Sequence, residues 1–329
     1  MISERNSMRV LVTGGSGFIG SHVMAILAAR GFEALNYDIK PPMFPTQMPQ
    51  WQQGDVTDGV RLAEVFTEFR PQAVIHLAAK AEIYAYDWND FDSIHLGTAT
   101  LLQAIDAYGE LETLVNISTQ LVIAPGHRPR SVLDYRPYTL YGEAKAYAES
   151  LLLQWRSPVH WLTVRPANIW GAHHPSFAGA IWRYIAKRYY LHPTTSKPVV
   201  RSYGYVENTA EQIVALMEAD RALTYRQVFY AADTVIDSAV WVDAFADALT
   251  GRRARRIPGS VLRLMGRAGD LARVFGKRAP IDSGRAMRMT ESYPVPLEAT
   301  HALTGPPRVT LEEGVQASTA WLRQLGPPY

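Results

Sequence analysis

The chain has 329 residues, of which 47% are hydrophobic and 19% charged, and its formal net charge at pH 7 is +2. These values are typical of a globular protein with one large domain or two, and the small net charge gives no reason to expect nucleic-acid binding. The absence of cysteine excludes disulfides, a thiol nucleophile and zinc held by cysteine. No run of the sequence approaches the roughly 18 apolar residues of a membrane span, so we predict a soluble, cytoplasmic protein without stable membrane insertion.

Residues 8–22, MRVLVTGGSGFIGSH, predict a buried strand, a glycine turn and a helix that starts near Gly17 or Phe18. In such a turn, glycine permits a sharp change of direction and lets backbone amides approach a pyrophosphate, while Gly20 allows close packing of the helix. Free N–H groups and the helix dipole both favour an anion at the helix N-terminus. A simple turn is the alternative. We predict dinucleotide contacts from Gly14, Gly17, Phe18, Ile19 and Gly20.

A second apolar strand, residues 34–37, ends in Asp38, eighteen positions after the last glycine of the turn. This is close to the offset of roughly 20 residues at which a carboxylate accepts hydrogen bonds from the adenosine ribose. Such a carboxylate repels a 2′-phosphate, so we predict NAD rather than NADP, with Lys40 as the one counter-argument. Asp55 and Val56 follow a third strand, and Asp55 has two interpretations: a contact to the adenine amino group or a cap of the next helix.

Strands and helices then alternate through the first half of the chain. We predict helices at 60–69, 95–108 and 141–155, and strands at 73–77, 113–117 and 161–165. Continuous apolar strands between helices indicate an α/β fold with a parallel sheet covered on both faces. The residues that follow two of these strands are predicted cofactor contacts: Leu77, Ala78, Ala79 and Pro166.

The pattern changes from Trp170 onward. We predict helices at 179–190, 208–220, 238–250 and 311–325, an extended edge segment at 199–206, and a strand at 227–231 that returns to the main sheet. On this basis the nucleotide-binding domain covers 8–170, with 205–235 returning to it. Residues 171–204 and 236–329 are predicted to form a smaller, interleaved substrate-binding lobe.

Tyr141 and Lys145 are four residues apart on a predicted helix, so they share one face. There the ammonium would lower the phenol pKa from about 10 and hold the nicotinamide ribose, which makes the phenol a usable general base. A tyrosine and a lysine four residues apart are common by chance. The pair is informative here because its helix follows the strand that ends at Ser118 and Thr119. Those hydroxyls are candidates to bind the same substrate oxygen; their alternative role is capping the strand end.

The segments TGGSGFIGSH, Asp38, GDV, HLAA, IST, YGEAK, VRPAN and RSYGYVEN occur in the order and spacing of the extended short-chain dehydrogenase/reductases. Over nearly its whole length the chain resembles their NAD-dependent epimerase/dehydratase branch. The resemblance implies a Rossmann fold, catalytic Tyr141, Lys145 and Thr119, and a substrate in the cleft between the lobes. It also implies that Asn168 and Arg201 lie near the diphosphate of a nucleotide sugar.

Arg201 also has a chemical argument, because a guanidinium suits a phosphate; the alternative is a surface arginine on an edge strand. Lys80 and Gln120 complete the predicted substrate contacts. Gln120-Leu121 stand where sugar dehydratases of the family have Asp-Glu, so dehydration is not expected, and epimerisation by a Cys/Lys pair needs a cysteine that is absent.

We therefore predict a homodimeric, NAD-dependent nucleotide-sugar epimerase or dehydrogenase that removes hydride from sugar C4 through a keto intermediate. One alternative is an NAD(P)-dependent 3-hydroxy dehydrogenase of sterols or lipids. The other is a non-catalytic nicotinamide sensor, although such proteins commonly lack the tyrosine and lysine.

Residues 251–288 are strongly basic and have an amphipathic helical pattern. Three interpretations remain open: the solvated face of a lid helix, a rim that attracts an anionic substrate, and a helix at a membrane surface. His173, His174 and His192 have no accompanying carboxylate cluster, so we predict a loop near the pocket there and no metal site.

Overall fold

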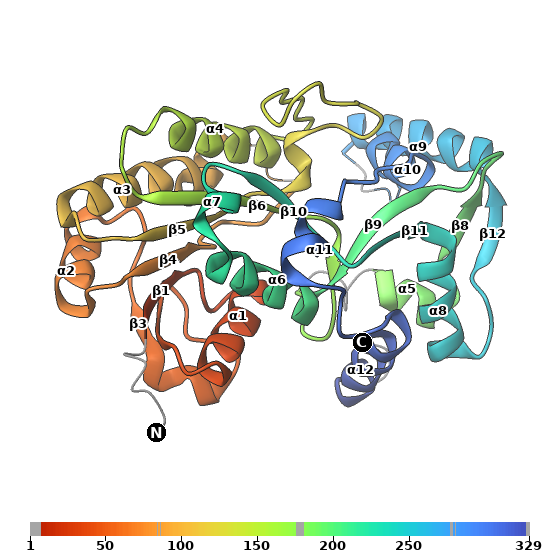
Figure 1. Cartoon of the computed structure of the whole chain (residues 1–329). Coiled ribbons are helices and arrows are strands. Elements are labelled where there is room, and N and C mark those ends of the chain that lie inside the picture. The colour runs from red at the N-terminus through yellow and green to blue at the C-terminus, as the bar shows by residue number, and fades with distance from the viewer. Residues whose placement is uncertain are drawn as a thin grey trace. The chain divides into compact units, whose positions relative to one another are not determined.

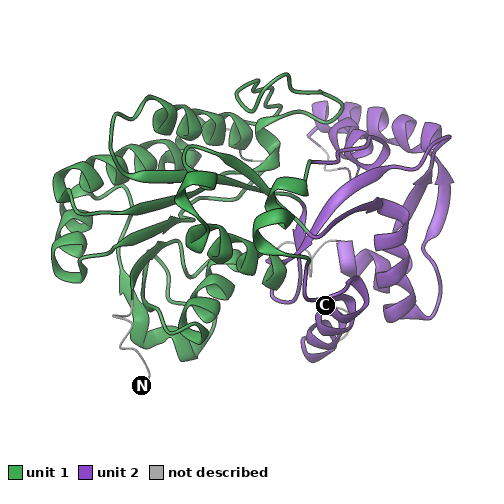
Figure 2. Cartoon of the chain, in the orientation of Figure 1, with its two compact units in different colours: residues 1–167, 206–232, 296–306 green, residues 168–205, 233–295, 307–329 purple. Residues whose placement is uncertain are grey.

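The computed structural model describes residues 8–83, 85, 87–175, 181–276, 279 and 281–326. The chain divides into two compact units, coloured green and purple in Figure 2. Unit 1 comprises Met1–Ala167, Val206–Ala232 and Pro296–Pro306, and unit 2 comprises Asn168–Tyr205, Asp233–Val295 and Pro307–Tyr329.

Unit 1 is built on a seven-stranded sheet with the strand order β10-β6-β5-β4-β1-β2-β3 (Figure 1). Its strands are β1 (Arg9–Thr13), β2 (Glu33–Asp38), β3 (Trp51–Gln53), β4 (Ala73–His76), β5 (Thr113–Ile117), β6 (His160–Pro166) and β10 (Val228–Ala231). All neighbouring strands are parallel, which confirms the predicted Rossmann-type α/β fold. The strand order reverses between β1 and β4, and ligands of doubly wound sheets bind at the carboxyl ends of strands at this point.

Helices cover both faces of this sheet. They are α1 (Phe18–Ala29), α2 (Gly59–Phe69), α3 (Asp92–Tyr108), α4 (Leu140–Gln154), α6 (Val206–Glu218), α7 (Arg221–Thr224) and α11 (Glu298–Thr304), with 3-10 segments η1 (Pro45–Gln50), η2 (Trp88–Phe91) and η3 (Gln120–Val122). One buried core joins the sheet to α1 and α6, for example through Leu27 and Ile213. A second core joins it to α2, α3 and α4 through Leu62, Leu101 and Leu152. The helices expected at 60–69, 95–108 and 141–155 are confirmed, with ends shifted by one to three residues.

Unit 2 contains a three-stranded sheet, β11-β9-β7, and a two-stranded sheet, β12-β8. Its elements are β7 (Ile169–Trp170), α5 (Arg183–Ala186), β8 (Leu191–Thr194), β9 (Val200–Tyr205), β11 (Thr234–Asp237), α8 (Ser238–Thr250), β12 (Arg255–Pro258), α9 (Gly259–Val274), α10 (Ser283–Thr290) and α12 (Leu311–Gln324). Large aromatic side chains dominate its core, among them Trp170, Trp182, Trp241 and Phe245.

The boundaries of the two units differ from the predicted ones. Residues 168–170, 205 and 233–235 belong to unit 2, because β9 pairs with both β7 and β11 there. Residues 296–306 belong to unit 1, because α11 packs beside β10: Thr300 Oγ1 donates to the Tyr230 carbonyl at 2.6 Å.

Two element predictions for unit 2 are wrong. The segment expected at an edge is β9, which lies in the middle of its sheet. The helix expected at 179–190 starts outside the described residues, and the α-helix within it, α5, covers only Arg183–Ala186. It ends there because Arg188 has a positive φ of 60°, which a helix does not accommodate. No helix in the described part of the chain is long and apolar enough to cross a membrane.

Candidate active site

The glycine turn between β1 and α1 lies against the chain that leaves β4. Gly14 has a φ of +76°, and a Cβ at this position would lie 2.5 Å from the backbone nitrogen of Ala78. A Cβ at Gly20 would overlap the carbonyl oxygen of Gly14, so the first turn of α1 folds onto the glycine turn itself. Gly17 is the N-cap of α1 and makes no side-chain cap hydrogen bond. The turn thus presents backbone N–H groups at a helix N-terminus, the arrangement that suits a phosphate.

Asp38, at the end of β2, is held toward this turn by two backbone amides. Its carboxylate accepts from the Ser16 nitrogen at 3.1 Å and from the Lys40 nitrogen at 3.0 Å. Asn36 supports the arrangement by donating from Nδ2 to Ser16 Oγ at 2.9 Å. A carboxylate fixed beside a phosphate-binding turn is suited to accept from the hydroxyls of an adenosine ribose.

Asp55 does not cap the following helix, so that alternative is wrong. Its Oδ1 accepts from the nitrogen and the hydroxyl of Thr57, at 2.9 and 2.8 Å, and forms a local turn. The cap of α2 is Asp58, which accepts from the Arg61 nitrogen. Val56 is buried. A contact between Asp55 and adenine stays a prediction.

The residues after β4 continue along the glycine turn. Leu77 donates its N–H to the Thr13 carbonyl at 2.9 Å, and both Ala78 and Ala79 are half-buried. Lys80, predicted as a substrate contact, is exposed and forms ion pairs with Asp90 at 2.5 Å and Glu82 at 3.6 Å. Its contact to substrate stays a prediction, as does the cofactor contact of Pro166, the last residue of β6.

Tyr141 is placed by the close approach of α4 to η3. Thr139 caps α4 by accepting from the Gly142 nitrogen at 3.0 Å. A Cβ at Gly142 would overlap the carbonyl oxygen of Leu121, so only glycine lets the first turn of α4 pack this closely on η3. Because η3 directly follows Thr119, this packing brings the element that carries Tyr141 against the segment after β5.

Ser118 and Thr119 are both buried, but their hydroxyls differ. Thr119 Oγ1 accepts from the Leu121 nitrogen at 3.3 Å and caps η3, the alternative role considered for this pair. Ser118 donates its backbone N–H to the Val164 carbonyl at 2.7 Å, while its hydroxyl is buried without a hydrogen-bond partner among the described residues. Ser118 is therefore the better placed of the two to bind a ligand oxygen. The neighbouring Gln120 is also buried.

The electrostatics of the Tyr141–Lys145 pair differ from the expectation. Burial raises the pKa of Tyr141 to about 12, so the expected lowering by Lys145 is not present in this structure. Burial lowers the pKa of Lys145 to about 8, and Glu149 partly opposes this change. Lys145 Nζ donates to the Ile117 carbonyl at 2.7 Å. The ammonium is thus fixed at the end of β5.

His76 is a site residue that the sequence analysis missed. It is buried at the end of β4, where Nδ1 contacts Thr13 Oγ1 at 2.7 Å and Nε2 contacts Thr98 Oγ1 at 3.1 Å. Burial and the Lys145 charge lower the pKa of His76 to about 3, which keeps the ring neutral at physiological pH. In the sequence, the HLAA segment, which begins with His76, could have indicated this residue. A neutral histidine between two threonines joins β4 to β1 and α3 beside the glycine turn.

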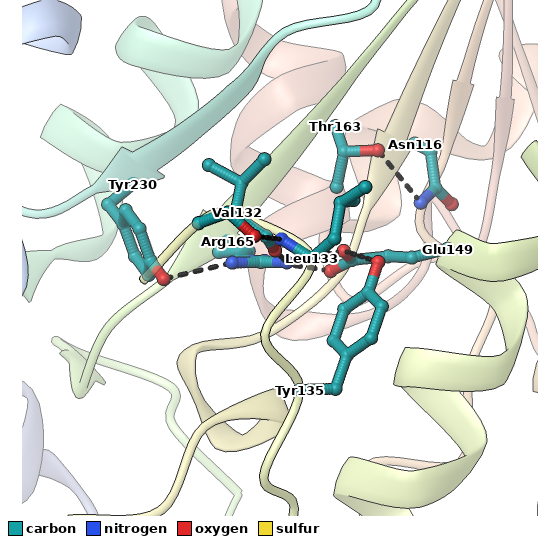
Figure 3. Close-up of polar contacts among 9 residues, drawn as sticks. Asn116, Val132, Leu133, Tyr135, Glu149, Thr163, Arg165 and Tyr230 are labelled. Carbon is teal, nitrogen blue, oxygen red and sulfur yellow. Dashed lines mark hydrogen bonds and ion pairs between the residues drawn. The ribbon is translucent and has the colours of Figure 1, made fainter. Parts of the chain in front are cut away.

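A buried ion pair on α4 and β6 was also missed (Figure 3). Arg165 donates from Nε to Glu149 Oε1 at 2.9 Å and from Nη2 to Oε2 at 2.6 Å. Arg165 also donates to Tyr230 Oη and the Val132 carbonyl, and Tyr135 Oη donates to Glu149. The pair ties α4, one turn beyond Lys145, to the sheet and to the 132–135 segment. Arg165 lies in the VRPAN segment, which gave no sign of its partner.

Asn168 and Arg201, the residues expected near a diphosphate, belong to unit 2. Asn168 Nδ2 donates to the Ser202 carbonyl at 2.8 Å, and the residue has a positive φ of 43°. Arg201 lies on the central strand β9, is 9% exposed, and donates to the carbonyls of Arg288 and Glu291. The alternative of a surface arginine on an edge strand is therefore wrong, while contact with a diphosphate stays a prediction for both residues.

The histidines considered for metal binding are explained by packing. His173 lies against the Trp321 ring, with centroids 5.0 Å apart, and burial lowers the pKa of His174 and of His192 to about 4. Within the described ranges, no group of three or more histidine, aspartate or glutamate side chains is placed to hold a metal ion.

The residues of unit 1 fit a dinucleotide, as three observations indicate. The N-terminus of α1 is ready for a phosphate, the Asp38 carboxylate is aimed at the glycine turn, and the buried Ser118 hydroxyl is without a partner in the described structure. A profile of the NAD dependent epimerase/dehydratase family matches residues 10–230, most of the chain. The chain belongs to this family. NAD is the cofactor of the family, in agreement with the expectation from Asp38.

The curated relatives include a steroid enzyme and a nucleotide-sugar enzyme. The chain is 33% identical over 177 residues to a 3 beta-hydroxysteroid dehydrogenase/Delta 5-->4-isomerase of Mycobacterium tuberculosis, which covers 50% of this chain and 47% of that protein. It is 34% identical over 110 residues to a UDP-glucose 4-epimerase of Rhizobium meliloti, covering 30% and 33%. The chain thus spans about half the length, or less, of these relatives.

A solved structure matches along almost the whole chain. It is the UDP-glucose 4-epimerase of Thermus thermophilus in complex with NAD, with 25% identity, a TM-score of 0.69, and coverage of 96% of this chain and 99% of that one. The sequence relatives therefore include both a steroid and a nucleotide-sugar enzyme, whereas this full-length structural match is a nucleotide-sugar enzyme.

Proposed function

We propose that this protein is an NAD-dependent enzyme that removes hydride from C4 of a nucleotide-diphosphate sugar, as a 4-epimerase or as a dehydrogenase. The observation that carries the proposal is the placement of Tyr141 and Lys145 on α4, whose first turn packs against η3 beside Ser118 and Thr119. The full-length match to the Thermus thermophilus epimerase supports the choice of a sugar substrate.

In this mechanism the phenolate oxygen of Tyr141 accepts the proton of the sugar hydroxyl. Bound NAD supplies the hydride acceptor at the nicotinamide ring. Ser118 and Thr119 position the sugar oxygen through their hydroxyls, and Lys145 holds the nicotinamide ribose. Re-reduction of the keto sugar on its other face completes an epimerisation, whereas its release completes a dehydrogenation.

The rate of oxidation should rise with pH, because Tyr141 must be ionised to act as the base and burial raises its pKa to about 12. Tyr141→Phe lacks the ionising hydroxyl, so its residual rate should not rise with pH. Profiles of kcat/KM between about pH 6 and pH 10 for the wild type and this variant measure the effect. A wild-type profile that is already flat at neutral pH, or a rise that is retained in Tyr141→Phe, would contradict the assignment of the base.

Cofactor choice should depend on Asp38. Asp38→Asn removes the charge that repels a 2′-phosphate and keeps one of the two acceptor oxygens, which receive the Ser16 and Lys40 amides separately. We expect the preference for NAD over NADP to fall by about tenfold or more, since one ionic contact is worth about 1.4 kcal/mol or more. Dissociation constants of both cofactors for the two proteins measure it. Tighter binding of NADP than of NAD by the wild type would contradict this role.

Ligand-induced stabilisation distinguishes a sugar from a steroid substrate. UDP, TDP, GDP and a sterol panel are each added to the protein with NAD, and the shift in melting temperature is recorded. A ligand at 100 times its dissociation constant adds about 2.7 kcal/mol of stability. We expect a nucleoside diphosphate to raise the melting temperature of the wild type. The rise should be smaller for Arg201→Lys, because a single ammonium cannot reproduce the guanidinium fork. Each variant is compared with itself without ligand, because Arg201 also holds the carbonyls of Arg288 and Glu291.

The second candidate function is a 3-hydroxysteroid or lipid dehydrogenase. Its support is the 33% identity to the mycobacterial steroid enzyme, and the same Tyr141 and Lys145 chemistry would serve it. A melting shift with a sterol and none with any nucleotide would select this function. The homodimer, the cytoplasmic location and the rejection of a non-catalytic sensor remain predictions.

A further inference from the structure

Helix α9 has an inner face made almost entirely of glycine. Its buried positions are Gly259, Leu262, Gly266 and Gly269, which recur at the spacing of one helical face. A Cβ at Gly266 would lie 3.0 Å from the Cβ of Ala286 on α10, and one at Gly269 would overlap the Ile281 carbonyl oxygen. The missing side chains let α10 and the segment before it pack directly on this face. Both helices are at the top of unit 2 in Figure 1.

The opposite face of α9 is apolar and exposed to water. We call it the outer stripe; its residues are Val261, Leu264, Ala268, Leu271 and Phe275. Leu264, Leu271 and Phe275 are 66%, 61% and 72% exposed. The stripe repeats every three or four residues, as the buried face does, so it is a second continuous face of the helix rather than scattered apolar side chains. From Val261 to Leu271 it extends over about 15 Å of helix, at about 1.5 Å per residue, and Phe275 follows at the C-cap. A contiguous exposed apolar surface of this kind marks a site of interaction.

Arginines lie on α9 beside the outer stripe and in the segment that precedes the helix. Residues 251–276 contain seven arginines and one aspartate, a net charge of +6 in a chain whose net charge is +2, so the remainder carries −4. Arg267 is exposed beside the outer stripe, three residues after Leu264 and four before Leu271. Arg263, one helical turn before Arg267, is also exposed. Asp270, the one acidic residue of the segment, accepts a hydrogen bond from the Ser283 nitrogen at 3.2 Å.

We propose that α9 docks reversibly on an anionic lipid surface, with the outer stripe in the boundary between headgroups and acyl chains and the arginines on lipid phosphates. Leucine, valine and phenylalanine on one face with arginine beside them are the composition of a helix that lies in the plane of a membrane interface. Each basic side chain near an anionic leaflet adds about 1 kcal/mol, or about a fivefold factor in binding. A convex helix face needs no shape-matched partner there, because lipids adjust to it.

The charge argues against a second copy of this chain as the occupant of the outer stripe. An interface between two identical copies related by twofold symmetry places the same patch on both sides, so the exposed Arg263 and Arg267 of the two copies would be brought together. Docking on lipid stands independently of the reaction proposed above. It requires only the folded unit 2 and not the chemistry of Tyr141.

Sedimentation with vesicles tests the proposal on the full chain with NAD present. The vesicles consist of phosphatidylcholine alone or of phosphatidylcholine mixed with phosphatidylglycerol, each at low and high salt. The wild type should bind the mixed vesicles, bind phosphatidylcholine at least about tenfold more weakly, and lose binding at high salt. Leu264→Glu/Leu271→Glu should lose binding to both, and Arg263→Glu/Arg267→Glu should lose at least about 25-fold on the mixed vesicles. The matched control is Val240→Glu, at a 53% exposed site on α8, which should bind as the wild type does.

Three results would overturn the proposal. The first is no sedimentation of the wild type with the mixed vesicles. The second is equal binding by the wild type and Arg263→Glu/Arg267→Glu, a pair of exposed positions whose replacement leaves the core intact. The third is a lipid-free dimer of the wild type, measured by sedimentation velocity, that Leu264→Glu/Leu271→Glu converts to a monomer, since a second copy would then cover the outer stripe.

Discussion

Replacing Tyr141 by phenylalanine should lower turnover by about two to four orders of magnitude, the range typical for loss of a general base. The ring remains, so its packing against Phe91, with centroids 6.0 Å apart, is retained and the fold should be unaffected. The turnover number is measured at saturating NAD and substrate, at several pH values. The residual rate should lose the rise with pH that the wild type has.

The control for this variant is cofactor binding. Asp38, the glycine turn and Lys145 are unchanged in Tyr141→Phe, so NAD should bind within a factor of about three of the wild-type affinity, a difference below about 0.7 kcal/mol. Ser118→Ala is the matched comparison within the site, because it removes a buried hydroxyl without touching the base. Full activity of Tyr141→Phe, or loss of NAD binding equal to the loss of turnover, would refute the role of the phenol.

Removing Arg165 should have the largest effect on stability. Arg165→Met leaves the buried carboxylate of Glu149 without its bidentate partner, and breaking a buried ion pair from one side costs about 3–5 kcal/mol of unfolding free energy. Urea denaturation followed by far-ultraviolet circular dichroism measures the loss. The matched control is Arg221→Met, whose partner Glu112 is exposed, and it should change the free energy by less than about 1 kcal/mol.

A double variant separates the lost partner from the lost volume. Arg165→Met/Glu149→Leu removes both charges, so it should regain much of the stability that Arg165→Met loses. A double variant less stable than the single one would mean that packing, rather than the unpaired carboxylate, dominates. Both variants also test positioning: since Glu149 is one turn from Lys145 on α4, the NAD affinity that depends on Lys145 should fall in whichever variant folds.

Features encoded locally were predictable from the sequence. The strand, glycine turn and helix around Gly14 depend on backbone sterics and hydrogen bonding within about fifteen residues, and the structure has them as expected. The parallel sheet was also predictable from the sequence, because strands that are apolar on both faces need helices on both sides of the sheet. The spacing of Tyr141 and Lys145 likewise placed them on one helix, α4.

Features that depend on distant partners were not predictable. Whether β9 lies at an edge or in the centre depends on β7 and β11, far apart in the sequence. Arg165 gave no sign that Glu149 is its partner, since sixteen residues and a helix separate them. The pKa of Tyr141 depends on how completely the folded chain excludes water, which four-residue spacing cannot reveal. Asp55 was ambiguous because a turn and a helix cap use the same carboxylate chemistry.

Hydride transfer from C4 of a nucleotide sugar is the most direct test of the proposed function. The protein is incubated with NAD and a panel of UDP-, TDP- and GDP-hexoses carrying deuterium at C4, and the label is followed by mass spectrometry and NMR. The proposal predicts deuterium at C4 of the epimeric sugar, or on the nicotinamide ring if the keto sugar is released, with either product formed at least about a hundredfold more slowly by Tyr141→Phe. Absence of both products with every nucleotide sugar, together with oxidation of a 3-hydroxysteroid by the same preparation, would contradict it.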